Sequence, residues 1–297
     1  MLYVFLSICC SVFVSIMLKL AKRYHIDVYQ AITWNYSMAI VLSWLFLKPQ
    51  LGNLSDAPLY LYGLLGLLLP SLFVILAASV KVTGIVKTDV AQRLSLFIPI
   101  LAAFLFFNET LNSIKLIGLI IGFAAIICLI PWQKHARNNR ENKALASSWI
   151  YLLVVFIGMG IIDVLFKQVA LVKQISTGTS LFIVYSLAFA IALIGLLYQV
   201  INKTMRFSWP HILIGWVLGI ANFGNILFYI KAHQSLAKNP SIVFSSMNIG
   251  VIIAGTFIGV FVFKEKLSLF NKIGILLALL AITIIYYPQL FTKLFSH

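Results

Sequence analysis

The sequence predicts an all-α membrane protein with ten transmembrane helices, arranged as two inverted five-helix repeats. Composition predicts the membrane class, because 62% of the 297 residues are hydrophobic and only 10% are charged. A soluble domain averages about 25% charged residues. A chain with so few charges cannot cover a surface that faces water, which excludes a soluble enzyme or binding module.

Ten apolar runs have the length of a membrane span. A helix needs about 20 apolar residues to cross roughly 30 Å of hydrocarbon, and runs of this length are too long and unbroken for barrel strands. In order, the predicted helices are 2–20, 29–47, 58–80, 84–107, 112–130, 148–169, 179–200, 209–231, 240–263 and 270–287. Pro70 and Pro99 fall inside the third and fourth, where each removes a backbone hydrogen bond and predicts a kink.

A basic hydrophilic stretch, 131–147, divides the chain near its midpoint. We interpret it as a linker between a first repeat, 1–130, and a second repeat, 148–287, which is followed by a short tail, 288–297. The segment carries several Lys and Arg residues against one acid, Glu141.

The two halves resemble each other most clearly at the end of the fourth helix. Glu109 is followed nine residues later by Gly118, and Glu265 is followed at the same spacing by Gly274. Because each unit has five helices, the second unit enters the membrane from the opposite side. Many secondary transporters are built in this way, with a small-molecule substrate bound near the midplane.

These features resemble the drug/metabolite transporter superfamily, specifically its EamA-type members. The resemblance rests on the five-plus-five duplication and on the Glu-x-Leu at 109–111 and 265–267 with the glycine beyond it. It implies helices packed around a central cavity, alternating-access transport, and substrates among amino acids, other metabolites, nucleotide sugars and drugs. It also implies that Glu109 and Glu265 are architectural.

The net charge of +15 predicts the orientation. Lys and Arg collect on the cytoplasmic side of membrane proteins, and here they are enriched in the loops after the odd-numbered helices. We therefore expect a multi-pass protein of the cell (inner) membrane with its central linker in the cytoplasm and both termini outside.

Two acids lie within apolar runs, and each has a base four residues later. Asp89 precedes Arg93 and Asp163 precedes Lys167, so each pair shares a helix face and can form an ion pair. Arg93, with its neighbour Gln92, is a candidate for binding a carboxylate or phosphate; alternatively, Asp89 merely neutralises it.

Asp163 and Asp89 are candidates for proton coupling, because burial and a nearby cation shift the pKa of a carboxyl group in opposite directions. The alternative for Asp163 is a structural pair with Lys167. Lys167 and Lys19 can each extend the ammonium group to the membrane interface, an interpretation that gives them no function.

Amides within the spans form a second set of candidate substrate ligands. They are Asn35, Asn222, Asn225 and Asn248. Such amides often bond only between helices, so this role stays open for each.

The Gly-x-x-x-Gly patterns at 118–122, 215–219 and 255–259 predict seams where helices approach closely.

Transport is the predicted function, with a small amphiphilic metabolite that is amino-acid-like or carries a carboxylate as substrate. A multidrug exporter of hydrophobic cations and a non-transporting membrane scaffold are the alternatives.

The sequence contains no H-E-x-x-H, P-loop or G-x-S-x-G motif, so we expect no enzyme, metal or cofactor. The expected partners are the substrate, the lipid bilayer and, if transport is coupled, protons, but not nucleic acid; the protein would act as a monomer or homodimer.

Overall fold

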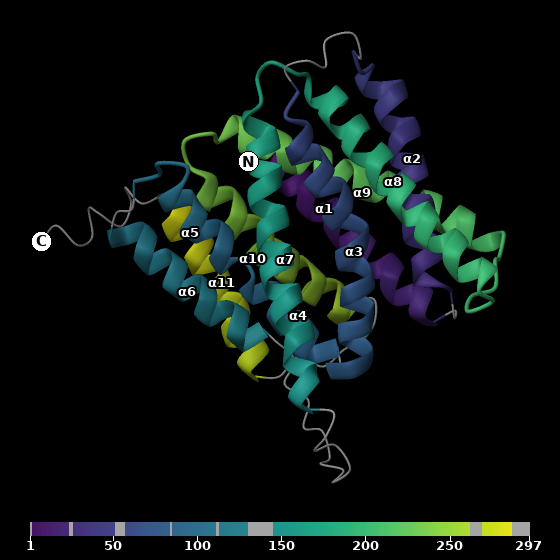
Figure 1. Cartoon of the computed structure of the whole chain (residues 1–297). Coiled ribbons are helices and arrows are strands. Elements are labelled where there is room, and N and C mark those ends of the chain that lie inside the picture. Colours follow the sequence, from purple (N-terminus) through teal and green to yellow (C-terminus); the bar gives the residue numbers. More distant parts are fainter. Residues whose placement is uncertain are drawn as a thin grey trace, which may run out of the picture. The chain divides into compact units, whose positions relative to one another are not determined.

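The computed structural model describes residues 2–23, 26–50, 57–83, 85–110, 113–129, 145–261 and 269–286. Within these ranges the chain forms helices and no strand (Figure 1). The helices are α1 (Leu2–Arg23), α2 (Val28–Leu47), α3 (Leu59–Thr83), α4 (Ile85–Leu94), α5 (Phe97–Leu105), α6 (Ser113–Leu129), α7 (Leu145–Leu171), α8 (Thr177–Ile201), α9 (Pro210–Ser235), α10 (Pro240–Phe261) and α11 (Leu269–Tyr286).

Nine of the ten predicted segments correspond to one helix each in the described part of the chain, and the fourth is divided. A turn at Ser95 and Leu96 separates α4 from α5, and Pro99 lies in the first turn of α5. Proline has no N–H to donate to the preceding turn, and the first turn of a helix tolerates it. The predicted kink at Pro99 is therefore a break, whereas Pro70 stays inside the continuous helix α3.

Five of the described helices are long and apolar enough to cross a bilayer, by length and composition: α3, α7, α8, α9 and α10. Elsewhere in the described ranges, shorter apolar stretches occur in α1, α4–α5, α6 and α11.

The chain forms two compact units, each of which draws helices from both halves of the sequence. Unit 1 comprises Met1–Val74 and Leu165–Ser235, and unit 2 comprises Ile75–Val164 and Leu236–His297. Unit 1 thus holds α1, α2, the first part of α3, the end of α7, α8 and α9. Unit 2 holds the remaining helical segments.

In unit 1, α2 and α8 lie antiparallel along their whole length (Figure 1). Near the start of α2, the Tyr29 hydroxyl donates to the carbonyl of Ala192, in the second half of α8, at 3.1 Å. At the opposite end, Gly178 approaches Leu47 so closely that a Cβ on the glycine would lie 2.6 Å from the leucine Cβ.

Helix α9 packs on α1 and α2 through small residues. A Cβ on Gly215 would lie 2.7 Å from the Ala31 carbonyl oxygen, and one on Gly219 would lie 2.6 Å from the Asn35 carbonyl oxygen. The prediction of a packing seam at 215–219 is therefore confirmed.

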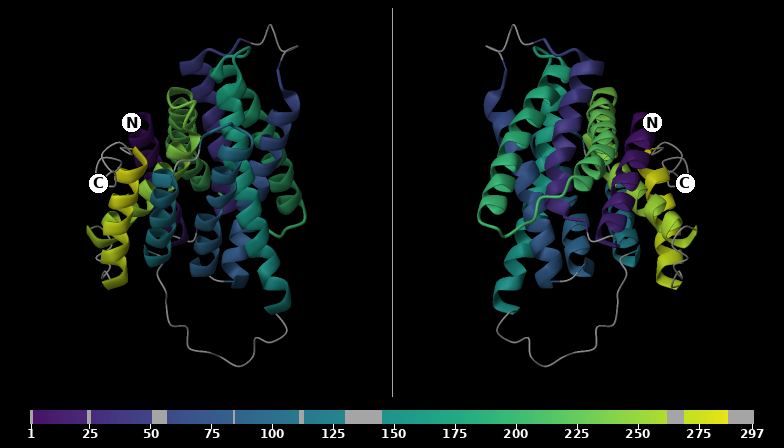
Figure 2. Two further views of the ribbon diagram at one scale, coloured as in Figure 1. Left: turned by 90° about the vertical axis from the view of Figure 1, so that its left-hand side faces the viewer. Right: turned by 90° about the vertical axis from the view of Figure 1, so that its right-hand side faces the viewer.

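In unit 2, α6 and α11 form a second antiparallel pair (Figure 2). A Cβ on Gly118 would lie 2.7 Å from Cγ1 of Ile285, and one on Gly122 would lie 3.6 Å from Cβ of Ala281. The seam at 118–122 is thus confirmed. At 255–259 the prediction is wrong for Gly255, which is exposed and where an added Cβ would meet nothing within 4 Å.

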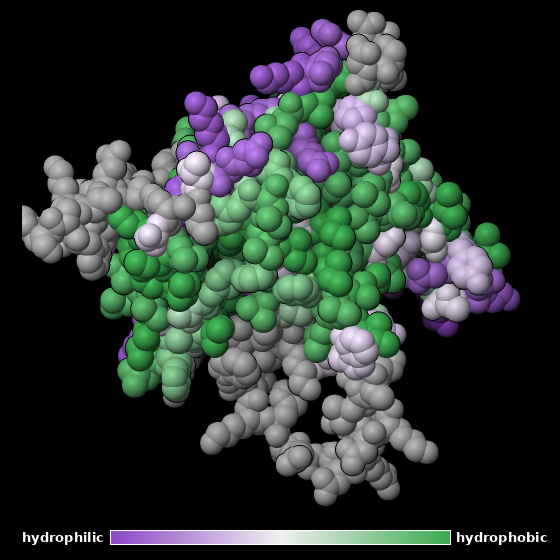
Figure 3. Space-filling model, turned by 60° about the vertical axis from the view of Figure 1, so that its left-hand side comes forward, coloured by the Kyte–Doolittle hydropathy of each residue, from purple (hydrophilic) through white to green (hydrophobic). Residues whose placement is uncertain are grey.

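Large apolar side chains are exposed along the helices. Hydrophobic residues dominate the face shown in Figure 3. Exposed large apolar side chains include Leu276 on α11, Leu213 on α9 and Ile194 on α8. Contiguous apolar surface of this kind suits contact with hydrocarbon rather than with water.

Candidate functional site

The predicted ligand residues are distributed over the two units. Unit 1 contains Asn35, Asn222 and Asn225, and unit 2 contains Gln92, Arg93, Asn248 and Asp163. The Asp89 side chain and the whole of Glu265 lie outside the described residues.

Two of the unit 1 amides have different surroundings. Asn225 accepts a hydrogen bond from the Ser7 hydroxyl at 2.8 Å, which ties α1 to α9. Asn35 is 1% exposed, and its side-chain oxygen has no hydrogen-bond partner among the described residues. A buried acceptor without a partner is unfavourable, so Asn35 is the better candidate for a ligand contact.

A pair of tyrosines lies deep in unit 1. Tyr36 on α2 and Tyr185 on α8 are both 0% exposed, and each hydroxyl lacks a hydrogen-bond partner in the described part of the chain. The two side chains lie close enough to interact electrostatically. The Tyr185 ring also contacts Phe223 of α9, with ring centroids 6.4 Å apart.

These tyrosines occupy equivalent positions in the two halves, a relation that the sequence prediction missed. Tyr-Ser-Met-Ala at 36–39 and Tyr-Ser-Leu-Ala at 185–188 share three of four residues. Each tyrosine is the ninth residue of its helix. The repeated tetrapeptide was the signal that could have identified them.

Lys167 lies in the interior of unit 1. It is 0% exposed, and its ammonium group donates to the His233 carbonyl oxygen at 3.4 Å. The expectation that Lys167 reaches the interface is therefore wrong. Its neighbours on both sides along the chain, Leu165, Phe166, Val169 and Ala170, are buried as well. This end of α7 is covered on most of its circumference, which leaves the lysine no route along an exposed face.

Aromatic rings line the helices next to Lys167. Phe166 meets Tyr229 of α9 edge-on, with centroids 6.3 Å apart. One turn further along α9, the His233 ring packs edge-on against Tyr229 at 4.7 Å.

An open cleft of about 550 Å³ lies at the same end of unit 1. Its lining comes from the start of α3 and from the end of α7 with the loop that follows: Pro58, Tyr60, Leu61, Gln168, Leu171, Val172 and Gln174. Leu171 is one helical turn beyond Lys167, so the cleft opens about 5–6 Å along α7 from the lysine.

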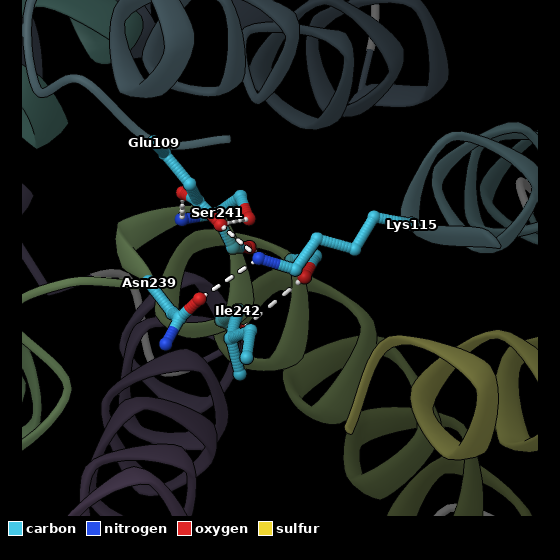
Figure 4. Close-up of polar contacts among 6 residues, drawn as sticks. Glu109, Lys115, Asn239, Ser241 and Ile242 are labelled. Carbon is cyan, nitrogen blue, oxygen red and sulfur yellow. Dashed lines mark hydrogen bonds and ion pairs between the residues drawn. The ribbon is translucent and has the colours of Figure 1, made fainter. Parts of the chain in front are cut away.

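In unit 2, Glu109 caps the start of α10 (Figure 4). Its carboxylate accepts a hydrogen bond from the Ser241 backbone N–H at 2.8 Å and another from the Ser241 hydroxyl. Lys115 neutralises the carboxylate at 3.0 Å and also donates to the Asn239 side chain at 2.8 Å. A carboxylate at a helix N-terminus satisfies free N–H groups, so the geometry of Glu109 is that of a helix cap.

The other unit 2 candidates are partly accessible. Gln92 and Arg93 on α4 and Asp163 on α7 are half-buried, and Asn248 donates to the Phe244 carbonyl of its own helix at 3.1 Å. The pairs Asp89–Arg93 and Asp163–Lys167 stay predictions.

Comparison with known proteins places this architecture in a family. The sequence profile of the EamA-like transporter family matches residues 1–130. An uncharacterised protein of Haemophilus influenzae is 45% identical over 290 residues, which are 95% of this chain and 96% of that protein. The chain belongs to the EamA-like transporter family, within the drug/metabolite transporter superfamily.

A solved crystal structure of another protein is similar in fold to this EamA-like chain. It aligns with a TM-score of 0.71 over 95% of the chain and 94% of its own length, at 13% identity. Family membership and the apolar helices together make this EamA-like protein a multi-pass membrane protein. Within a membrane, buried ionisable side chains such as Lys167 are energetically costly and usually mark a functional site.

Proposed function

We propose that this EamA-like protein is a secondary transporter that moves a small amphiphilic metabolite with a carboxylate group across the cell membrane by alternating access. Its ten spans form two inverted repeats around a central cavity, with the basic linker in the cytoplasm and both termini outside.

The observation that carries this proposal is the antiparallel packing of α2 on α8. These are the second helices of the two predicted repeats, and each carries a buried tyrosine, Tyr36 or Tyr185, as its ninth residue. The fifth helices, α6 and α11, also pack antiparallel. Inverted repeats require equivalent helices to run in opposite directions, and two such halves can exchange equivalent conformations.

The candidates for substrate contacts in this proposal are polar residues, taken separately for each unit. Asn35 and Asn222 are the candidates in unit 1, and Gln92 and Arg93 are the candidates in unit 2. Asp163 is the candidate for coupling transport to protons, because a half-buried carboxyl group can bind a proton in one state and release it in the other.

Counterflow in proteoliposomes tests this proposal. Vesicles that contain the full-length protein are loaded with a bacterial metabolite extract, and compounds that leave faster than from protein-free vesicles are identified by mass spectrometry. A carrier gives saturable uptake of the labelled compound, accelerated by unlabelled compound on the opposite side. Absence of saturable flux for every compound would favour a membrane scaffold and overturn the proposal.

Asp163 favours a second candidate, a multidrug exporter of hydrophobic cations, because a half-buried carboxylate is a counter-ion for such cargo. Ethidium counterflow that is lost in Asp163→Asn, with no flux of any carboxylate, would select this alternative.

A further inference from the structure

The cap of α10 in unit 2 comes from a distant part of the chain. Glu109 lies in the connection between α5 and α6, and it accepts a hydrogen bond from the backbone N–H of Ser241, 132 residues later (Figure 4). Lys115 on α6 pairs with the carboxylate at 3.0 Å, and only 1% of the Glu109 side chain and 10% of the Lys115 side chain are exposed. Taking two charges out of water is unfavourable unless the pair is well bonded, so capping alone is a poor reason for this arrangement.

Helix α10 also carries a cap of its own. Asn239 directly precedes the helix and Pro240 is its first residue, and these residue types are favoured at these two positions. An asparagine there normally accepts a hydrogen bond from an N–H in the first turn of its helix. Its side-chain oxygen instead accepts from the Lys115 ammonium group at 2.8 Å, while Glu109 bonds the Ser241 N–H. The start of α10 therefore has two alternative caps, and the distant one is in use.

The distant cap lies just beneath the surface of unit 2. Glu109 is 6% exposed, but Asn108 and Thr110 on either side of it are exposed. Asn108 has a φ of 51°, in the left-handed region that asparagine adopts more readily than most residues. The Glu109 N–H donates to the Ala103 carbonyl oxygen of α5 at 3.1 Å. The carboxylate thus turns inward from an exposed connection, and a change in this connection can return it to water.

We infer that the start of α10 is a two-state switch. In the observed state, Glu109 and Lys115 hold α10 to the connection between α5 and α6 and to α6 itself. In the other state, Glu109 withdraws to water, Lys115 releases Asn239, and Asn239 caps α10 in its place. The inference rests on the proposed function and deepens it, because α5 and α6 belong to the first predicted repeat and α10 to the second. Release at this end of unit 2 lets these helices move apart during alternating access.

Unfolding temperatures of the full-length protein in detergent test the two caps by a double-mutant comparison. Glu109→Ala removes the distant cap and Asn239→Ala removes the local one. Because each single variant keeps one cap, the double variant should lose more than the sum of the two single shifts. If Asn239 served only to hold Lys115, these side chains would form one network, and the double variant would lose no more than that sum. Lys238→Gln changes an exposed cation next to Asn239 and is the matched control, expected to unfold like the wild type.

Accessibility of a buried position tests the movement of α10. Ser245 lies one turn beyond Ser241 and is 1% exposed. After the three native cysteines are replaced by serine, Ser245→Cys should react slowly with a maleimide, and adding Glu109→Ala should speed the reaction at least tenfold. Adding Lys238→Gln instead should leave the rate unchanged. If Glu109→Ala does not fold, Ser241→Ala carries this test: it removes one hydrogen bond of the carboxylate and no charge, and it should speed labelling at least threefold.

A double variant that loses no more than the sum of the single variants would overturn the inference, and so would a labelling rate that Glu109→Ala leaves unchanged. Excess destabilisation with faster labelling, but without saturable counterflow of any compound, would keep the switch and remove the transport proposal. Saturable counterflow together with a double loss at or below the sum would keep transport and remove the switch.

Discussion

Tyr36 and Tyr185 each bury a hydroxyl in unit 1 that has no hydrogen-bond partner among the residues the structure describes. A buried hydroxyl without a partner costs about 1–3 kcal/mol, so each must be retained for a reason other than the stability of this conformation. Each is the ninth residue of its helix, and in the proposed inverted repeat α2 and α8 are equivalent helices.

We therefore predict opposite effects on stability and on transport when these hydroxyls are removed. Tyr36→Phe and Tyr185→Phe should unfold at the same or a higher temperature than the wild type while lowering the counterflow rate severalfold. Ser43→Ala is the matched control, expected to transport normally, because it removes another buried α2 hydroxyl that lacks a partner within the described part of the chain. Lower stability with unchanged transport in the tyrosine variants would show that the hydroxyls serve packing alone.

At single positions, sequence reasoning located the costly polar residues but not their surroundings. Lys167 was expected at the interface because a lysine near a helix end can extend along an exposed face. Whether that face is exposed depends on distant parts of the chain such as His233 on α9, which is 66 residues away. Likewise, nothing local to Glu109 indicates that Ser241 lies within reach of its carboxylate.

Between helices, close approach depends on glycines that face a neighbouring backbone. A Cβ added to Gly219 would lie 2.6 Å from the Asn35 carbonyl oxygen. Gly255 has the same local sequence pattern, but a Cβ added there would have no neighbour within 4 Å. The Gly-x-x-x-Gly pattern alone cannot separate these cases, because it records spacing along one helix and not the position of the next.

This difference gives a prediction with a built-in control. Gly219→Ala should destabilise the protein by about 1–3 kcal/mol, because the added methyl group forces α9 away from α2. Gly255→Ala should be neutral or slightly stabilising, since alanine favours a helix over glycine by up to about 1 kcal/mol. Unfolding of both variants in detergent, followed by tryptophan fluorescence, compares them. Equal unfolding temperatures would contradict the packing described for α2 and α9.

The positions of the helices followed well from apolar run length, because a membrane span must satisfy its backbone hydrogen bonds within itself. The exception is 84–107, where the turn at Ser95 and Leu96 separates the more polar helix α4 from the apolar helix α5. Proline marks the place, but sequence alone did not decide between a kink and a break.

On the scale of the whole molecule, the two compact units do not follow the two sequence halves. Each unit combines helices of both halves, so a linear division of the chain cannot describe how its helices pack. The predicted duplication indicates this mixing of helices only indirectly, because it expects equivalent helices to run in opposite directions.

The orientation of the linker relative to the tail tests the central claim most directly, because an odd number of spans in the second repeat places them on opposite sides of the membrane. Single cysteines, Asn138→Cys or Ser296→Cys, are introduced after Cys9, Cys10 and Cys128 are replaced by serine, and intact cells are treated with a membrane-impermeant maleimide. The account predicts that Ser296→Cys is labelled in intact cells and that Asn138→Cys is labelled only after the membrane is permeabilised. Labelling of both positions from the same side would contradict the inverted repeat and the transport mechanism proposed from it.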